Sequence, residues 1–350
     1  MRRTAVLGVV LLALCVAGCG VRHVPLAPPT TTAAAPAPAA ASAADVASGP
    51  ALSPPLTRRP AGRTIHVGAL PDALAADPRA HQFAVAIHDP SRLALVDSRS
   101  GRVTQRVAVP VGQERHPAPA VFLVPAETGR HAVAVQPAPV TPAAAPQPRA
   151  ALVLGRTFVT GPRGDSVDVL DGGRPTAHFG SAPAALASAD FDTRLAVLSS
   201  ARRTLELFDP RTLRVVATTP AGRRPTGIAT FGDLVFVSDS DGDAVLAYST
   251  RPRLHPVARI PVGGAPYALA VDPLRRDLYV TQPARNRLTT ISIARFAAVS
   301  SLPTVRQPDA VAVDSATGTI AVAGHRDGLL QLVTAERRDA GLTRIARRPD

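Results

Sequence analysis

The amino-acid sequence predicts an all-β protein, specifically a β-propeller, and two observations carry this prediction. The chain repeats itself, with clear unit starts at Pro183, Pro225, Pro266 and Pro308, spaced 42, 41 and 42 residues apart. Each unit holds about four short runs of alternating apolar residues separated by turn residues, which is typical of strands. A period of about 40 residues with four strands indicates a propeller blade. Because one blade cannot bury both faces of its sheet, the blades must stack in a ring.

The number of blades follows from the register of the repeat. Residues 71–78 and 266–273 share one pattern at an offset of 195 residues. Six units are clean, whereas the interval between Pro117 and Arg149 shows strands only near 120–124 and 132–135. A proline-rich run follows there, and proline removes the donors of a strand ladder. We therefore predict seven blades with one degenerate, and six blades as the alternative.

Closure of the ring can also be predicted. Thr64–Val67 matches the outer strand that precedes Pro266, yet it has no blade of its own. We expect it to complete the last blade and so join the two ends of the chain. Leu342–Ala346 competes for the same position, and the sequence does not decide between them. The propeller is assigned to residues 63–346, followed by a tail at 347–350.

The turns of each repeat have a common chemistry. The tightest position between the second and third strands is mostly filled by residues that tolerate a positive φ, as hairpins require. These positions are Ser91, Asp165, Arg203, Asp243, Asn286 and Gly328. The Asp-Pro that follows the first strand is interpreted as a turn element and not as a catalytic acid. Asp239–Asp243 resembles part of a calcium loop without its downstream glutamate, so we favour a hairpin turn there and predict no metal site.

The first residues predict export and lipidation. Arg2 and Arg3 precede an apolar stretch, Ala5–Leu14, that is too short to span a bilayer. Val16–Cys19 follows and resembles the lipobox of bacterial lipoproteins, which implies cleavage after residue 18 and lipidation of Cys19. An ordinary secretory signal and an uncleaved anchor are the alternatives. The predicted location is the extracytoplasmic face of the cell membrane.

Composition limits the partners of the exported chain. Residues 19–62 are rich in proline, alanine and threonine and are predicted to form a disordered tether. Cys15 leaves with the signal, so the mature chain has no thiol besides Cys19. The formal net charge of +13 suits an anionic envelope polymer, while the aromatic content of 3% disfavours nucleic acid. We expect a monomer with no cofactor.

The repeat also resembles a known family. Leu278-Tyr279-Val280-Thr281-Gln282 and the blade start at Pro261–Pro266 are similar to the YVTN family of β-propeller repeat proteins, over roughly residues 63–346. The resemblance implies the propeller fold and an extracytoplasmic binding, surface-layer or lactonase-like role. Gln282 replaces the asparagine of the motif, and the motif contains no catalytic residue to carry over.

Ligands of propellers usually bind where loops surround the central channel. We expect this rim to contain the loops between the second and third strands and the loops that lead into the first strand. The candidate rim residues are His88, Arg163, Arg202, Arg224, Asp239, Asp241, Tyr267, Gln282, Arg285, His325 and Arg326. His88 and His325 occupy the same repeat position in blades that become neighbours when the ring closes. We interpret them as surface histidines, with a shared ligand site as the alternative.

These observations favour a non-enzymatic binding or scaffold module whose partner is an envelope protein, peptide or glycan. The sequence has no serine nucleophile motif, no spaced pair of carboxylates and no complete metal set. The alternative is a propeller hydrolase or lyase, lactonase-like, with its site in the central channel. An enzyme would bring several titratable side chains together in one pocket.

Overall fold

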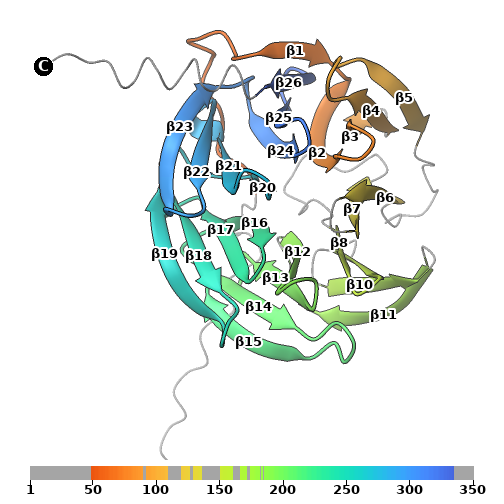
Figure 1. Ribbon diagram of the computed structural model, residues 1–350, viewed down its shortest axis with the longest axis vertical. Helices are drawn as coiled ribbons and strands as arrows, with labels where there is room; N and C mark the ends of the chain where they lie inside the picture. Colours follow the sequence, from red (N-terminus) through yellow and green to blue (C-terminus); the bar gives the residue numbers. More distant parts are fainter. Residues whose placement is uncertain are drawn as a thin grey trace, which may run out of the picture. The chain divides into compact units, whose positions relative to one another are not determined.

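The structure is a computed structural model, and it describes residues 49–89, 92–108, 120–126, 129–135, 150–160, 166–171, 174–181, 183 and 185–334. These residues form six four-stranded antiparallel sheets and one two-stranded sheet, arranged as a ring (Figure 1). The all-β propeller predicted from the repeat is therefore confirmed. No helix among the described residues is long and apolar enough to cross a membrane.

Each blade takes its strands consecutively from the chain, except the last blade. In chain order the strands are β1 (Arg63–His66), β2 (Ala69–Asp77), β3 (Gln82–Asp89), β4 (Arg92–Asp97), β5 (Val103–Ala108), β6 (Ala120–Ala126), β7 (Gly129–Val135), β8 (Ala150–Val153), β9 (Arg156–Thr160), β10 (Ser166–Asp171), β11 (Arg174–Gly180), β12 (Ala185–Ala189), β13 (Arg194–Ser199), β14 (Thr204–Phe208), β15 (Val215–Pro220), β16 (Pro225–Phe231), β17 (Leu234–Asp239), β18 (Ala244–Ser249), β19 (His255–Pro261), β20 (Leu269–Asp272), β21 (Asp277–Gln282), β22 (Arg287–Ser292), β23 (Ala297–Pro303), β24 (Pro308–Asp314), β25 (Thr319–Gly324) and β26 (Leu329–Val333). A short 3-10 helix, η2 (Pro283–Arg285), joins β21 to β22.

The first strand of each complete blade lies on the inside of the ring. These strands contact one another in the order β2, β24, β20, β16, β12 and β8, and β7 lies between β8 and β2. The two-stranded sheet β6–β7 thus occupies the interval that the sequence assigned to a degenerate blade. The proline-rich run that follows it lies outside the described residues.

The hydrophobic core lies between neighbouring blades. One cluster joins Phe83, Val85 and Ile87 of the first complete blade to Ala321 and Leu330 of the last, and all five side chains are fully buried. Similar clusters join the other adjacent four-stranded blades from β8 to β25. Burial of the alternating apolar residues against the next blade explains why a single repeat could not fold alone.

Strand β1, one of the two candidates that the sequence left open, joins the last blade. β1 pairs antiparallel with β26, with Arg63 opposite Leu332 and His66 opposite Leu329. The buried amide of Gln331 strengthens this junction, because its Nε2 donates to the carbonyl of Ala61 at 2.7 Å and its Oε1 accepts from the amide of Val305 at 3.0 Å. The rival strand, Leu342–Ala346, and the tail at 347–350 lie outside the described residues.

The turn chemistry of the repeat is also confirmed. Arg203, Asp243, Asn286 and Gly328 all adopt a positive φ, from 49° to 64°. Ser91 and Asp165 lie outside the described residues. The aspartates at the ends of the inner strands accept hydrogen bonds from the amides of the following turn, as Asp272 Oδ1 does from Leu274 and Arg275 at 3.1 Å. These carboxylates therefore stabilise the turns that follow the inner strands, as the sequence indicated.

Candidate functional site

Loops from three consecutive blades form a polar surface, which we call the docking face. It is made by loops between second and third strands and by loops that lead into the next inner strand. Its described residues include Arg224, Asp241, Pro283, Arg285, Asn286, Gln307, Asp309, His325 and Arg326. These are the two classes of loop in which the sequence placed the ligand-binding rim.

An extended segment of the chain itself lies on the docking face. The side chain of Gln307 makes two hydrogen bonds to the main chain of this segment. Its Oε1 accepts from the amide of Ser53 at 2.9 Å, and its Nε2 donates to the carbonyl of Ala51 at 2.9 Å. Asn286 Nδ2 donates to the carbonyl of Pro54 at 2.9 Å, and Arg224 Nη1 donates to that of Gly49 at 2.9 Å. The sequence assigned residues 19–62 to a disordered tether, but the chain contacts the propeller from Gly49 onward.

Ser53 is the one side chain of this segment that the docking face encloses. Its Oγ donates to the carbonyl of Pro283 at 2.6 Å and accepts from the amide of Gln307 at 3.1 Å. Ser53 is 8% exposed, whereas the neighbouring Leu52 is 77% exposed. The segment is therefore held by its main chain and by one small hydroxyl side chain.

The two amide side chains that bind the segment, those of Asn286 and Gln307, are held in place by further hydrogen bonds within the ring. Asn286 has a left-handed backbone with φ of 49°, and its own amide donates to the carbonyl of Pro283. Its Oδ1 accepts from the amide of Gln307 at 3.2 Å. Gln307 Nε2 also donates to Asp309 Oδ1 at 3.0 Å, which sets the orientation of its amide. Asn286 and Gln307 are 7% and 3% exposed, so their polar atoms depend on protein partners.

A cavity of about 180 Å³ lies beside the docked segment. Its lining residues are Pro54, Pro55, Leu56, Thr57, Arg58, Arg285, Asn286, Arg287, Pro303 and Thr304. Of these described residues, three are arginines and none carries a carboxylate. Burial lowers the pKa of the Arg287 guanidinium, and the positive charges of Arg58 and Arg285 lower it further. The cavity is thus an electropositive pocket beside residues 49–54.

Two of the predicted rim aspartates have different roles. Asp239 is buried, and its Oδ1 accepts from the main-chain amides of Arg223 and Arg224 at 2.9 Å and of Gly242 at 3.2 Å. A side chain at Gly242 would collide with this carboxylate. Asp241 is exposed and pairs with Arg224 Nε at 2.6 Å. The hairpin-turn interpretation of Asp239–Asp243 is therefore confirmed by its hydrogen bonds.

Two other predicted rim residues belong to the interior. Gln282 is 2% exposed; its Nε2 donates to the carbonyls of Val262 and Gly263, and its Oε1 accepts from Thr289 Oγ1. Tyr267 is 7% exposed and packs in an apolar cluster with Tyr279. Their positions in the repeat were read correctly, but their side chains turn into the fold instead of toward a ligand.

The remaining predicted residues are distributed around the same face. Arg202 is exposed and lies 3.5 Å from Glu206, in a blade apart from the docked segment. His325 Nδ1 lies 3.9 Å from Asp309 Oδ2, and Arg326 beside it is exposed. Arg163 and the side chain of His88 lie outside the described residues, as does Cys19. The structure thus brings Arg224, Arg285 and His325 to the surface that holds residues 49–54.

Sequence reasoning did not select the residues that make most contacts with the segment. Asn286 was assigned only to a tight turn, and Gln307 was not singled out although it lies in a loop leading into an inner strand. Both carry amides that can donate and accept at once, which is the one signal that could have pointed to main-chain recognition. Ser53 lay in a stretch with no hydrophobic period, so nothing distinguished it.

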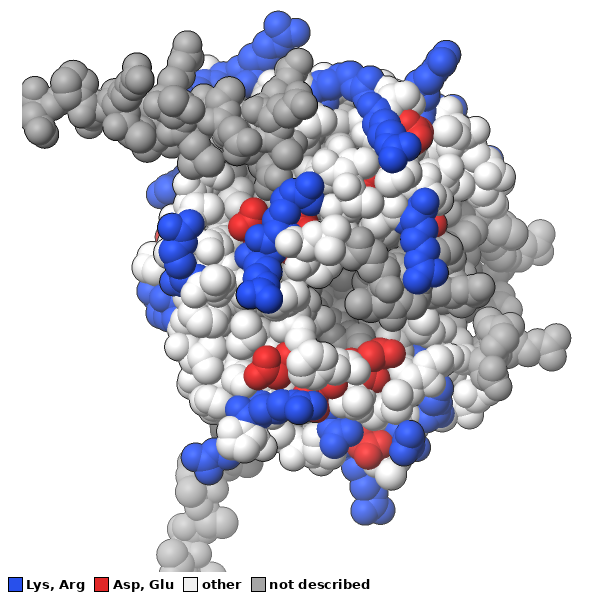
Figure 2. Space-filling view, viewed as in Figure 1, with Lys and Arg blue, Asp and Glu red and all other residues white. Residues whose placement is uncertain are grey.

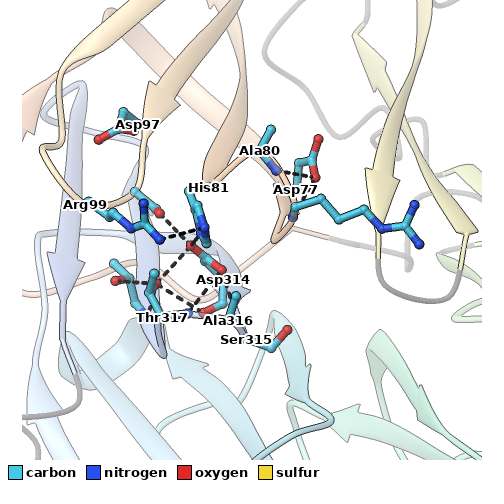
Figure 3. Close-up of polar contacts among 12 residues, drawn as sticks. Asp77, Ala80, His81, Asp97, Arg99, Asp314, Ser315, Ala316 and Thr317 are labelled. Atoms are coloured by element: carbon cyan, nitrogen blue, oxygen red, sulfur yellow. Dashed lines mark hydrogen bonds and ion pairs between the residues drawn. The ribbon is translucent and has the colours of Figure 1, made fainter.

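A second polar cluster lies at the other end of the strands, on the face of the ring opposite the docking face. It joins the first and last complete blades (Figure 3). Asp314 Oδ2 accepts from Ser98 Oγ at 2.6 Å and lies 3.1 Å from His81 Nδ1. The Asp314 side chain is fully buried. The other ring nitrogen of His81 lies 2.7 Å from an Arg99 guanidinium nitrogen. Both nitrogens of this histidine are therefore engaged, and the cluster joins blades across the point of closure.

Charge is unevenly spread over the molecule. Figure 2 shows arginine side chains around a central hollow, with acidic side chains gathered along its lower edge. The chain has 39 basic residues against 26 acidic ones. This excess favours negatively charged groups at the surface of the ring.

Comparisons with known proteins support the fold. No family model matches the chain, and no curated protein matches its sequence. Among solved structures, streptogramin B lyase is similar with a TM-score of 0.59 and 14% identity, over 78% of this chain and 97% of that chain. A chain of the mitotic checkpoint complex is similar with a TM-score of 0.59 and 12% identity, over 82% of this chain and 96% of that one. At these identities the likeness concerns the propeller fold alone.

Proposed function

We propose that this protein is a membrane-anchored, extracytoplasmic β-propeller with repeats of the YVTN type, acting as a non-enzymatic binding module for a cell-envelope partner. One observation carries the proposal: the docking face holds residues 49–54 by the main-chain atoms of the segment. A surface that binds an extended chain of its own has the polar groups needed to bind another. The partner is an envelope protein, peptide or glycan.

The anchor in this proposal rests on the first residues of the chain. Val16–Cys19 has the small residues and the thiol of a lipobox, preceded by a short apolar stretch. A Cys19→Ser change in the native host should release the protein from the detergent phase of a Triton X-114 extraction into the aqueous phase. Retention of the Cys19→Ser chain in the detergent phase would argue for an uncleaved anchor instead.

The alternative function is a propeller hydrolase or lyase. The described Asp–His pair, Asp314 with His81, has the residue types of a catalytic dyad. However, a general base needs a ring nitrogen free to take a proton from its nucleophile, and His81 Nε2 faces Arg99. Ser98 donates to the carboxylate rather than to the histidine. The geometry of this cluster favours a structural junction and so favours the binding proposal.

Site-specific crosslinking tests the binding proposal. A photo-reactive residue in place of Arg326, exposed on the docking face, should capture an envelope partner in the native host. The matched control replaces Leu274, which is 63% exposed in the β20–β21 turn at the other end of the strands. Mass spectrometry then identifies the captured species. Equal capture at both positions, or none at position 326, would contradict a binding role for the docking face.

A further inference from the structure

Residues 49–54 are bound in the manner of a peptide ligand. Six hydrogen bonds hold the segment, and four of them involve main-chain atoms of Gly49, Ala51, Ser53 and Pro54. Three side chains of the ring provide most of the partners: Arg224, Asn286 and Gln307. Main-chain contacts of this kind accept many sequences, and the enclosed Ser53 followed by Pro54 is the element that selects among them.

The polar groups of this groove are complementary to a polypeptide main chain. Gln307 is 3% exposed and directs both ends of its amide at the segment, while Asn286 directs Nδ2 at it. These amides place a donor and an acceptor where the main chain of the segment offers a carbonyl and an N–H group. The surface is therefore complementary to the main chain of an extended segment.

The hydrogen bonds that hold the segment end at Pro54, and residues 55–58 line the adjacent cavity. Arg58 follows in the chain and lines the electropositive cavity together with Arg285 and Arg287. Like charges in one pocket repel, and the described lining residues offer no carboxylate to offset them. An acidic side chain at the position of Arg58 would instead pair with two guanidinium groups.

We propose that residues 49–58 are an internal occupant of a groove whose intended ligand is an extended Ser-Pro peptide that carries an acidic side chain in the position of Arg58. This inference rests on the proposed function and names the ligand class of the same site. The covalently attached segment has an effective concentration of about millimolar, so it keeps the groove filled until a better-matched chain replaces it.

Exchange of the segment is tested with the full chain and a labelled peptide. The peptide has the sequence of residues 49–58, and its binding is measured by fluorescence anisotropy. In the Ser53→Asp variant the internal segment loses its hydrogen bond to the Pro283 carbonyl and gains a buried charge, so the groove becomes free. We expect the Ser53→Asp chain to bind the peptide at least about ten-fold more tightly than the wild type. Leu52→Asp is the matched control, because the same charge at this exposed position should leave binding as weak as in the wild type.

The acidic preference is tested with a second peptide that has glutamate in place of Arg58. We expect it to bind the Ser53→Asp chain about five-fold more tightly than the first peptide at low ionic strength, and the difference should shrink as salt is added. Exchange of Arg285 for Gln in the Ser53→Asp chain should reduce this preference without abolishing binding. Gln307→Ala in the same background should abolish binding of both peptides.

Two results would overturn the inference. Failure of the Ser53→Asp chain to bind either peptide would mean that the groove does not exchange its occupant. Equal binding of both peptides at low salt would remove the acidic preference. Crosslinking at position 326 separates these failures from failure of the proposed function. If position 326 captures an envelope partner but no peptide binds, the proposed binding function is supported and the peptide inference is wrong. If the peptide binds but no partner is captured, the surface binds peptides and the proposed role in the envelope is contradicted.

Discussion

The two ends of the strands use similar turn residues for different purposes. On the side of Asp77, Asp272 and Asp314, each carboxylate is satisfied by its own turn or by the adjacent blade. On the docking face, Asn286 and Gln307 reach a segment more than 230 residues away in sequence. The first arrangement stabilises the ring, whereas the second depends on an extended chain from outside the blades. The comparison separates polar groups that join strands and blades from polar groups that hold residues 49–54.

The largest loss of stability is expected from a change at Asp314, on the side of the ring away from the docking face. Its carboxylate is fully buried and accepts from five donors: Ser98 Oγ, His81 Nδ1, Thr317 Oγ1 and the amides of Ala316 and Thr317. Asp314→Ala should lower the free energy of unfolding by about 3–5 kcal/mol, because the donors of two blades lose their partner. Urea denaturation measures the change. Asp209→Ala, at a surface turn, should have a much smaller effect, and a similar loss in both variants would show that closure does not depend on Asp314.

A smaller effect is expected at the closing strand. Gln331→Ala removes an amide that bridges Ala61, Pro303 and Val305 across the junction of β1 with the last blade. We expect a loss of about 2–3 kcal/mol in the free energy of unfolding, since buried main-chain groups are left without partners. Gln105→Ala, exposed on β5, is the control and should change little. An unchanged unfolding midpoint in Gln331→Ala would mean that strand pairing alone closes the ring.

A change on the docking face should mainly affect residues 49–58 and leave the blades protected. Gln307→Ala removes the acceptor of the Ser53 amide and the donor to the Ala51 carbonyl. We expect a loss of about 1–2 kcal/mol in stability together with faster hydrogen exchange of the Ser53 amide. Exchange measured by mass spectrometry over residues 49–58 is the readout, and the inter-blade strands should keep their protection. If protection fell equally throughout the ring, the segment would be part of the fold and not an occupant.

The smallest effect concerns pH on the side opposite the docking face. Burial raises the pKa of the Asp190 carboxyl, but hydrogen bonds from Arg251, Thr193 and Thr250 and the charge of Arg251 lower it overall. Because the folded pKa is below the unfolded value, this pair stabilises the protein above about pH 4 and loses its effect as pH falls through the folded pKa. Arg251→Gln should therefore lower Tm at pH 7 only slightly, since Arg251 is largely exposed and solvent screens its charge. Once the pH falls below the folded pKa of Asp190, the two chains should melt together, and a constant difference at all pH values would contradict the assignment.

Much of the fold could be predicted because it follows from the spacing of the repeats and the alternation of apolar residues within them. Pro183, Pro225, Pro266 and Pro308 mark repeats, and the alternation between them defines strands that pack on their neighbours. The positive φ of Asn286 followed from its residue type. The site was predicted less well. The loops between the strands were located correctly, but whether they bind a ligand stays a prediction. Repeat position does not say whether a side chain such as Tyr267 or Gln282 turns inward.

The sequence by itself determined the all-β ring, its turns and the use of Thr64–Val67 as the candidate closing strand, because these follow from periodicity and from matches at a fixed offset. Only the tertiary structure decided that Gly49–Pro54 lies on the docking face and that Gln307 reads it. The physical reason is that recognition here uses main-chain amides and carbonyls, which every residue carries. The one enclosed side chain, Ser53, is a single polar residue in a stretch without a hydrophobic period, so it does not mark the segment in the sequence.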